Sequence, residues 1–246
     1  MSPDSPWPPL PFGEWRKTCQ TLHLWTQIVG KVRLALTPLV NHWWNVTYHL
    51  TSRGFTTRPI PYRARTFSID FDFIDHCLSI ATSDGVVERL DLAPMSVAVF
   101  YGELMRRLQA LGIEVHIWTM PSEIEDAVPF DQDHANVDYD PLWARRFWVV
   151  LSQSHRVMNE FRARFIGKTS PVHFFWGSFD LAVTRFSGRA APPPSGTTPH
   201  LASWVMQEAY SHEVYSCGSG PATVVTARRP FMSMPIPSPP ASARRR

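Results

Sequence analysis

Residues 171–189 have the sequence PVHFFWGSFDLAVTRFSGR, and this segment decides how the C-terminal half of the chain folds. Its aromatic and β-branched residues are typical of strands, and Gly177-Ser178 lies near its centre. The segment therefore predicts either one bent strand or a hairpin that turns at Gly177-Ser178. In a hairpin the two arms lie side by side, and His173 can approach Asp180.

The same segment holds the best candidates for a functional site. It places ionisable groups among aromatic side chains, namely His173, Asp180, Arg185 and Arg189, with Trp176 beside them. Buried ionisable groups are costly unless they are paired, so these residues form either a satisfied core network or the lining of a pocket. In a pocket, we expect His173 and Asp180 to act as a catalytic acid–base pair. Arg185 and Arg189 would bind an anionic group of the substrate, and Trp176 would form a wall.

Glu208 and His212 are auxiliary candidates, His212 for catalysis and Glu208 for substrate binding. They are four residues apart, and on a helix such a pair can share a proton or a metal. The alternative is an exposed pair at a helix end. Because only two ligands are visible, we predict no metal site, and the sequence identifies no cofactor.

Two further groups carry weaker signals. His23, Gln27 and Lys31 recur every four residues in the first predicted helix, so they line either a cleft or, as we expect, a solvated stripe. Trp43 and Trp44 could supply a stacking wall, and core tryptophans explain them equally well.

Asp70, Asp72, Asp75 and His76 form a cluster at the end of a predicted strand. A carboxylate pair with a histidine can bind a cation or act as a base. A solvated strand face that ends in a loop is the alternative.

The hydrophobic pattern predicts an α+β fold, mainly an antiparallel sheet with a long N-terminal helix and two further long helices packed on it. Strands do not alternate regularly with helices, which argues against a parallel sheet. Helices are expected over residues 14–36, 94–111 and 140–166, with a short helix from 198 to about 212, and strands over 43–50, 65–73, 76–82, 86–92 and 113–120.

Composition excludes several classes of protein. The chain has 246 residues, of which 44% are hydrophobic and 18% charged, as in ordinary globular proteins. No secretory signal and no apolar run of membrane-spanning length is present, and the three cysteines are widely spaced. We therefore expect a cytoplasmic protein that is not membrane-bound and that takes a small-molecule ligand.

The net charge of +3 does not indicate nucleic-acid binding. Residues 219–246 contain five arginines and no acidic residue, so the preceding residues carry a net charge of 3 − 5 = −2. A body without excess positive charge lacks the usual electrostatic signature of a nucleic-acid-binding domain.

Four strings of sequence resemble an uncharacterised bacterial domain-of-unknown-function family, and they span most of the chain before Gly218. They are Thr21–Leu36, Phe71–His76, Ser170–Arg189 and Glu208–Val214 (EAYSHEV). The resemblance implies no activity and no functional residue. The expected function is therefore that of an enzyme acting on a small polar or anionic molecule by His/Asp acid–base chemistry. The alternatives are a binding module without catalysis, for a small molecule or a protein, and an inactive truncated copy.

The chain departs from the family pattern after Gly218. In the family, EAYSHEV is followed by a Gly-Phe-Trp-Pro-Gly stretch, whereas Ser219–Ala222 is SGPA. Deleting one T from TTC TGG CCC GGC gives codons that begin Ser-Gly-Pro-Ala, which is consistent with a shifted reading frame. We therefore expect one α+β domain over residues 1–218, and a disordered, Pro/Ser/Arg-rich tail over 219–246 that is out of frame.

Overall fold

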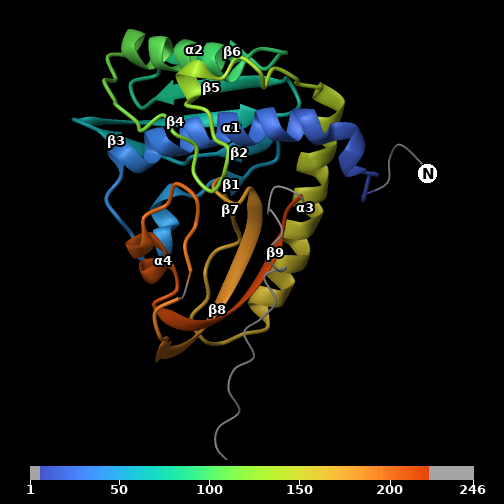
Figure 1. Cartoon of the computed structure of the whole chain (residues 1–246), viewed down its shortest axis with the longest axis vertical. Helices are drawn as coiled ribbons and strands as arrows, with labels where there is room; N and C mark the ends of the chain where they lie inside the picture. The colour runs from blue at the N-terminus through green and yellow to red at the C-terminus, as the bar shows by residue number, and fades with distance from the viewer. Residues whose placement is uncertain (1–5, 195, 222–246) are drawn as a thin grey trace, which may run out of the picture.

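A computed structural model describes residues 6–194 and 196–221 of the chain. It contains two antiparallel sheets that lie one above the other, with helices packed around them (Figure 1). In chain order the elements are α1 (Phe12–Leu36), η1 (Asn41–Val46), β1 (His49–Leu50), β2 (Gly54–Thr56), β3 (Ile60–Tyr62), β4 (Arg65–Asp72), β5 (Cys77–Thr82), β6 (Val87–Asp91), α2 (Val97–Ala110), η2 (Phe130–Gln132), α3 (Pro141–Ala163), β7 (His173–Phe175), β8 (Asp180–Ala190), α4 (Ser203–Ala209) and β9 (His212–Ser219). The predicted α+β class is confirmed.

The larger sheet has the strand order β1-β2-β4-β5-β6, and β3 also pairs with β4. Along β4 the phenylalanines and Ile69 are buried while the alternate polar residues are partly exposed, as the period of two predicts. The helices α1 and α2 cover the buried face. Trp25 of α1 stacks on Phe100 of α2 at 4.7 Å between ring centroids, and Phe100 in turn lies 6.4 Å from Phe71 of β4.

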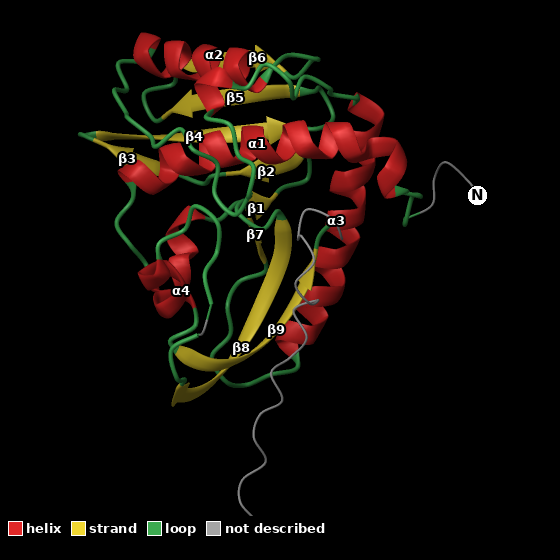
Figure 2. Cartoon of the chain, in the orientation of Figure 1, coloured by secondary structure: helices red, strands yellow, loops and turns green. Residues whose placement is uncertain are grey.

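The smaller sheet has the order β7-β8-β9 and contains the segment 171–189. This segment forms a hairpin, because β7 and β8 pair across a turn at Trp176–Phe179. The helix α3 runs along this sheet (Figure 2). Phe147 of α3 packs on Phe179 at 5.2 Å between ring centroids, which anchors the turn in the core.

The two sheets meet where β1 and β7 lie side by side (Figure 1). Tyr48, just before β1, and Phe174 of β7 exchange two backbone hydrogen bonds, of 2.9 and 2.8 Å. Both side chains are fully buried. Because side chains alternate along a strand, the neighbouring residues on each strand face the other way.

The polar residues of α1 are not a solvated stripe, and this expectation was wrong. His23, Gln27 and Lys31, called the α1 polar row below, are 3%, 0% and 3% exposed. Residues 113–120, predicted as a strand, form no strand, and residues 118–122 lie against this row. The Lys31 ammonium donates to the carbonyls of Trp118 and Met120 at 3.2 and 2.5 Å. The irregular segment is thus held by side chains of α1 and not by a neighbouring strand.

Two other predicted elements differ from the structure. Residues 43–50 form the end of η1 and the short β1 and not one strand, because His42 and Trp43 have left-handed backbone with φ of 58° and 60°. The short helix α4 ends at Ala209, and β9 follows at His212. The strand β9 runs one residue past the expected boundary at Gly218, and residues 222–246 of the predicted tail lie outside the described residues.

None of the described helices combines the length and apolar character that a membrane span requires.

Candidate functional site

His49 and His173 face each other where the two sheets join. They are the next residues along from the Tyr48–Phe174 bridge, so they lie opposite one another on adjacent antiparallel strands. Their side chains point away from the core side that Tyr48 and Phe174 occupy, and the two ring centroids are 5.8 Å apart. The junction of the sheets therefore brings together two histidines that are 124 residues apart in the sequence.

These histidines line a cavity of about 430 Å³, called the sheet-junction pocket below. Its lining also includes two arginines and a tryptophan, namely Arg33 from the end of α1, Arg58 from the β2–β3 connection and Trp44 of η1. Its remaining walls are mostly apolar: Pro38, Val40, Pro59, Pro61 and Pro171. The lining residues come from five separate segments, and none of them is acidic.

The pocket holds buried polar atoms that lack a partner in the described part of the chain. They are both ring nitrogens of His173, which is 1% exposed, and Nε of Arg33, which is 9% exposed. By contrast, the Asn45 amide is fully used, since it accepts from the Val40 backbone and donates to Thr37, each at 3.2 Å. A buried polar atom without a hydrogen bond costs about 1–3 kcal/mol. The residues that line the pocket thus hold unmet hydrogen-bonding capacity just beneath its surface.

Burial and neighbouring positive charges keep the two imidazoles neutral. Burial, followed by the charges of Arg58 and Arg33, lowers the pKa of His49 to about 4. Burial, followed by His49 and Arg33, lowers the pKa of His173 to about 3. The pKa of Arg33 itself falls to about 10, mainly through burial. An anion in this pocket would reverse these shifts, because it favours the charged form of each group.

Strained backbone also borders the pocket. Arg58 has φ of 60°, and Trp43, next to the lining residue Trp44, has the same value. A non-glycine residue in this region costs on the order of 1–3 kcal/mol and persists only where the surrounding structure imposes it.

Of the residues predicted from the hairpin, His173 alone lies in this pocket. Asp180 pairs in register with Phe175, whereas His173 pairs with Ala182, so the two residues share a face of the sheet without being opposite each other. Asp180 lies at the turn, where burial and the nearby Glu123 raise its pKa to about 7. The structure shows no hydrogen bond from His173 to Asp180, since the His173 ring has no partner among the described residues. The predicted acid–base pair is not assembled.

Trp176, Arg185 and Arg189 serve the fold. The Trp176 indole donates to the carbonyl of Val46 at 2.9 Å and packs against Gly30 of α1, where an added Cβ would lie 2.4 Å from the ring. The guanidinium of Arg185 lies over the Phe161 ring of α3 at 3.5 Å, on the opposite face of the sheet from His173.

Arg189 lies on the surface, where it forms an ion pair of 2.7 Å with Glu213. The two predicted anion-binding arginines are therefore neither near each other nor in the pocket.

Glu208 and His212 do not share a helix face, because α4 ends between them. Glu208 accepts a hydrogen bond of 3.2 Å from the backbone of His42, whose ring bonds the carbonyl of Ala209 at 3.0 Å. His212 is exposed at the start of β9. The hydrogen bonds of His42 with Glu208 and Ala209 link η1 to α4.

Asp72, Asp75 and His76 of the acidic cluster are tied up in contacts near the surface, whereas Asp70 lies within β4 with one carboxylate oxygen buried. Arg53 pairs with Asp72 at 2.5 Å and with Asp75 at 2.7 Å, and His76 bonds the Tyr139 hydroxyl at 2.9 Å. Within the described ranges no group of three or more His, Cys, Asp and Glu side chains is placed to hold a metal ion.

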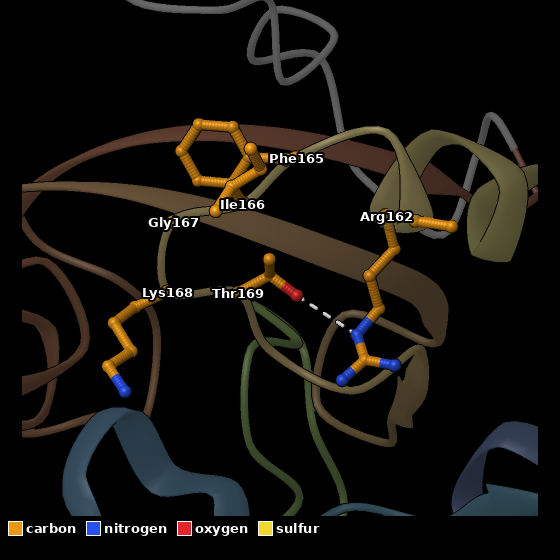
Figure 3. Close-up of a pocket in the computed structure, with 7 residues that line it drawn as sticks. Arg162, Phe165, Ile166, Gly167, Lys168 and Thr169 are labelled. Atoms are coloured by element: carbon orange, nitrogen blue, oxygen red, sulfur yellow. Dashed lines mark hydrogen bonds between the residues drawn. The ribbon is translucent and has the colours of Figure 1, made fainter.

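A second hollow of about 470 Å³ lies at the end of α3 (Figure 3). Its lining comes from one stretch of chain, residues 162–169. Figure 3 shows Arg162 bonded to Thr169, at 2.9 Å, while Lys168 points to the other side. Arg162 also donates to the carbonyl of Ser170 at 2.8 Å. Because its arginine is committed to closing the loop, this hollow offers less binding capacity than the sheet-junction pocket.

Arg33, His49 and Arg58 were not predicted from the sequence as site residues. His49 was placed in a predicted strand, and Arg33 is one basic residue near the end of a helix, so neither carries a local signal. Trp44 was named as a stacking wall, and it does line the pocket, with its ring centroid 6.0 Å from that of His173.

The fold and site define an α+β protein with a ligand-sized pocket at the junction of two antiparallel sheets. The chain belongs to the Family of unknown function (DUF5996), whose model matches residues 7–246. This confirms the resemblance to an uncharacterised family, and the match runs through residues 219–246 as well. No curated protein and no solved structure gives a significant match to the chain.

Proposed function

We propose that this protein binds a small organic anion in the sheet-junction pocket. The observation that carries the proposal is the set of buried nitrogens without a partner, on His173 and Arg33, in a cavity with no acidic side chain in its lining. Charge-assisted hydrogen bonds from an arginine are about twice as strong as neutral ones, so an anion gains most from these nitrogens.

The proposal is tested by measuring how small sodium salts change the melting temperature of the full chain. The panel comprises acetate, benzoate, phosphate and sulfate, with chloride as the ionic-strength control. We expect at least one of the organic anions to raise the melting temperature in a saturable way.

Two matched arginine variants locate the binding site. Arg58→Asn removes a lining charge, and Asn tolerates the left-handed backbone at this position. Arg189→Asn removes an exposed arginine outside the pocket. Arg58→Asn should weaken binding at least tenfold while Arg189→Asn leaves it unchanged. Equal affinity in both variants would place the anion elsewhere.

Acid–base catalysis on the bound anion is a second candidate function. It is supported by the two neutral imidazoles that face each other at 5.8 Å, since a neutral imidazole can accept a proton. The test is to incubate the full chain with an aqueous cell extract and to follow anionic metabolites by mass spectrometry. An enzyme depletes one anion with time, and the His173→Leu variant does not. Binding without turnover would support a binding module.

We also propose, from the sequence alone, that residues after Gly218 are translated in a shifted frame. Codons for Ser219–Ala222 are compatible with a one-base deletion in Phe-Trp-Pro-Gly. Resequencing the gene tests this directly: a missing or extra base near codon 219 is expected, and an unchanged sequence at high coverage would overturn the proposal.

A further inference from the structure

We propose that the ligand of the sheet-junction pocket is a monocarboxylate with a flat, apolar body, such as an arene carboxylate. This inference rests on the proposed function, and it adds the chemical class of the ligand. Three features of the pocket support it, namely the free edge of Arg33, the absence of acidic lining residues, and the apolar walls.

The guanidinium of Arg33 presents one free edge. Its Nη1 donates to the carbonyl of Thr47, which fixes the plane of the group. Its Nε is buried and has no partner among the described residues, and no hydrogen bond is formed there by Nη2. The Nε–Nη2 edge carries two parallel N–H groups that match the two oxygens of a carboxylate. A carboxylate that reaches this edge, with a small shift of the side chains that cover Nε, would satisfy both N–H groups.

The charges around this edge fit an anionic ligand. Arg33 and Arg58 are the positive groups of the lining, while burial keeps His49 and His173 neutral. The lining has no carboxylate to balance a ligand ammonium, so an amino acid would leave its amine unpaired. The pocket thus favours an anion over a zwitterion or an amine.

The remainder of the pocket is mostly apolar and rich in rings. The Trp44 indole forms one side, and Pro38, Pro59, Pro61 and Pro171 supply rigid rings around it. A cavity of 430 Å³ equals about 14 water volumes at ~30 Å³ each, which is far more than a carboxylate alone occupies. An aromatic ring on Trp44 would gain stacking as well as burial.

The test compares dissociation constants of probe molecules for the full chain by isothermal titration calorimetry. The probes are 2-naphthoate, cyclohexanecarboxylate, acetate, 2-naphthyl phosphate, 2-naphthylmethylamine and phenylalanine. We expect 2-naphthoate to bind at least tenfold more tightly than acetate and several-fold more tightly than cyclohexanecarboxylate. The amine and phenylalanine should show no saturable binding.

Two variants test the head-group contact and the location of the site. Arg33→Lys keeps the charge and removes the planar edge, so it should weaken 2-naphthoate at least tenfold. Val40→Glu places a negative charge at the exposed rim of the pocket and should weaken every anion without altering the core, because Val40 is 42% exposed. If Arg33→Lys fails to fold, Val40→Glu still tests the site.

The outcomes distinguish this inference from the proposed function. If 2-naphthoate and acetate bind equally, the flat apolar body is wrong while anion binding stands. If 2-naphthyl phosphate binds more tightly than 2-naphthoate, the carboxylate head group is wrong. If none of the anions binds, the proposed function falls as well.

Discussion

Two buried histidines in this protein have similar environments and different roles. His23 of the α1 polar row is 3% exposed and His173 of the sheet-junction pocket is 1% exposed. Burial lowers the pKa of both, to about 4 and about 3. The Nε2 of His23, however, lies 3.0 and 2.9 Å from the carbonyls of Trp176 and Gly177 and donates to them. The ring of His173 has no partner among the described residues.

The comparison shows that burial and a shifted pKa do not by themselves mark a functional site. His23 joins α1 to the turn of the β7–β8 hairpin, so its hydrogen bonds stabilise the fold. His173 is held on a strand with both nitrogens unsatisfied, which is unfavourable for stability alone. Hydrogen-bonding capacity left unmet inside a cavity is therefore the better indicator of a ligand site.

The largest expected effect comes from replacing each histidine by leucine. His23→Leu leaves two buried carbonyls without a donor and should cost about 2 kcal/mol or more of unfolding free energy. His173→Leu removes two unsatisfied nitrogens and should leave the stability unchanged or raise it by up to about 1 kcal/mol. Urea unfolding of both variants measures the difference.

His173→Leu should at the same time abolish anion binding. A loss of stability equal to that of His23→Leu would instead assign His173 to the structural core, and the comparison between the two regions would fail.

Acidification is expected to act on the pocket through the same unsatisfied groups. The pKa of His173 is about 3 in the native state and near 6.5 in the unfolded chain, so below pH 6.5 the unfolded state binds the proton first. Stability is therefore full above pH 6.5 and is lost as the pH falls. The loss by pH 5 is on the order of 2 kcal/mol for this imidazole.

The measurement is the unfolding free energy at pH 7 and pH 5 in the wild type and in His173→Leu. The variant should lose about 2 kcal/mol less than the wild type over this interval. His23 contributes equally to both proteins, so its own titration cancels. An identical loss in the two proteins would show that His173 is already protonated or exposed at neutral pH.

Much of the fold could be predicted from the sequence, because the pattern of apolar residues is a local property. The strands predicted over 65–73, 76–82 and 86–92 and the helix predicted from residue 140 all correspond to observed elements. The hairpin in 171–189 was one of two predicted possibilities, and it is the one the structure contains.

The site was harder to predict from the sequence, because it is formed by long-range contacts. His173 was named, whereas its neighbours Arg33, His49 and Arg58 are brought to it by the bridge between the two sheets. Nothing local in the sequence specifies that bridge. Residues 113–120 were misassigned as a strand for the same reason, since the hydrogen-bond partners of 118–122 are side chains on α1.

An effect of opposite sign is expected for Asp180, at the other end of the hairpin from His173. Burial and Glu123 raise the pKa of Asp180 to about 7, so the native state holds this proton at a pH where the unfolded chain has released it. The cost of ionising it therefore grows as the pH rises from the unfolded pKa near 3.8 to about 7, and it is constant above pH 7. The stability of Asp180→Asn relative to the wild type should therefore rise by about 2–3 kcal/mol between pH 5 and pH 8.

This response to acid is opposite in sign to that of His173. Burial disfavours the charged form of each group, which is the protonated form of His173 and the deprotonated form of Asp180. Because Asp180 does not line the sheet-junction pocket, Asp180→Asn should also bind anions with unchanged affinity. Calorimetric titration at pH 8 with the tightest anion of the panel checks this. A clear loss of affinity would restore the acid–base pair predicted from the sequence, since it would show that Asp180 acts on the same ligand as His173.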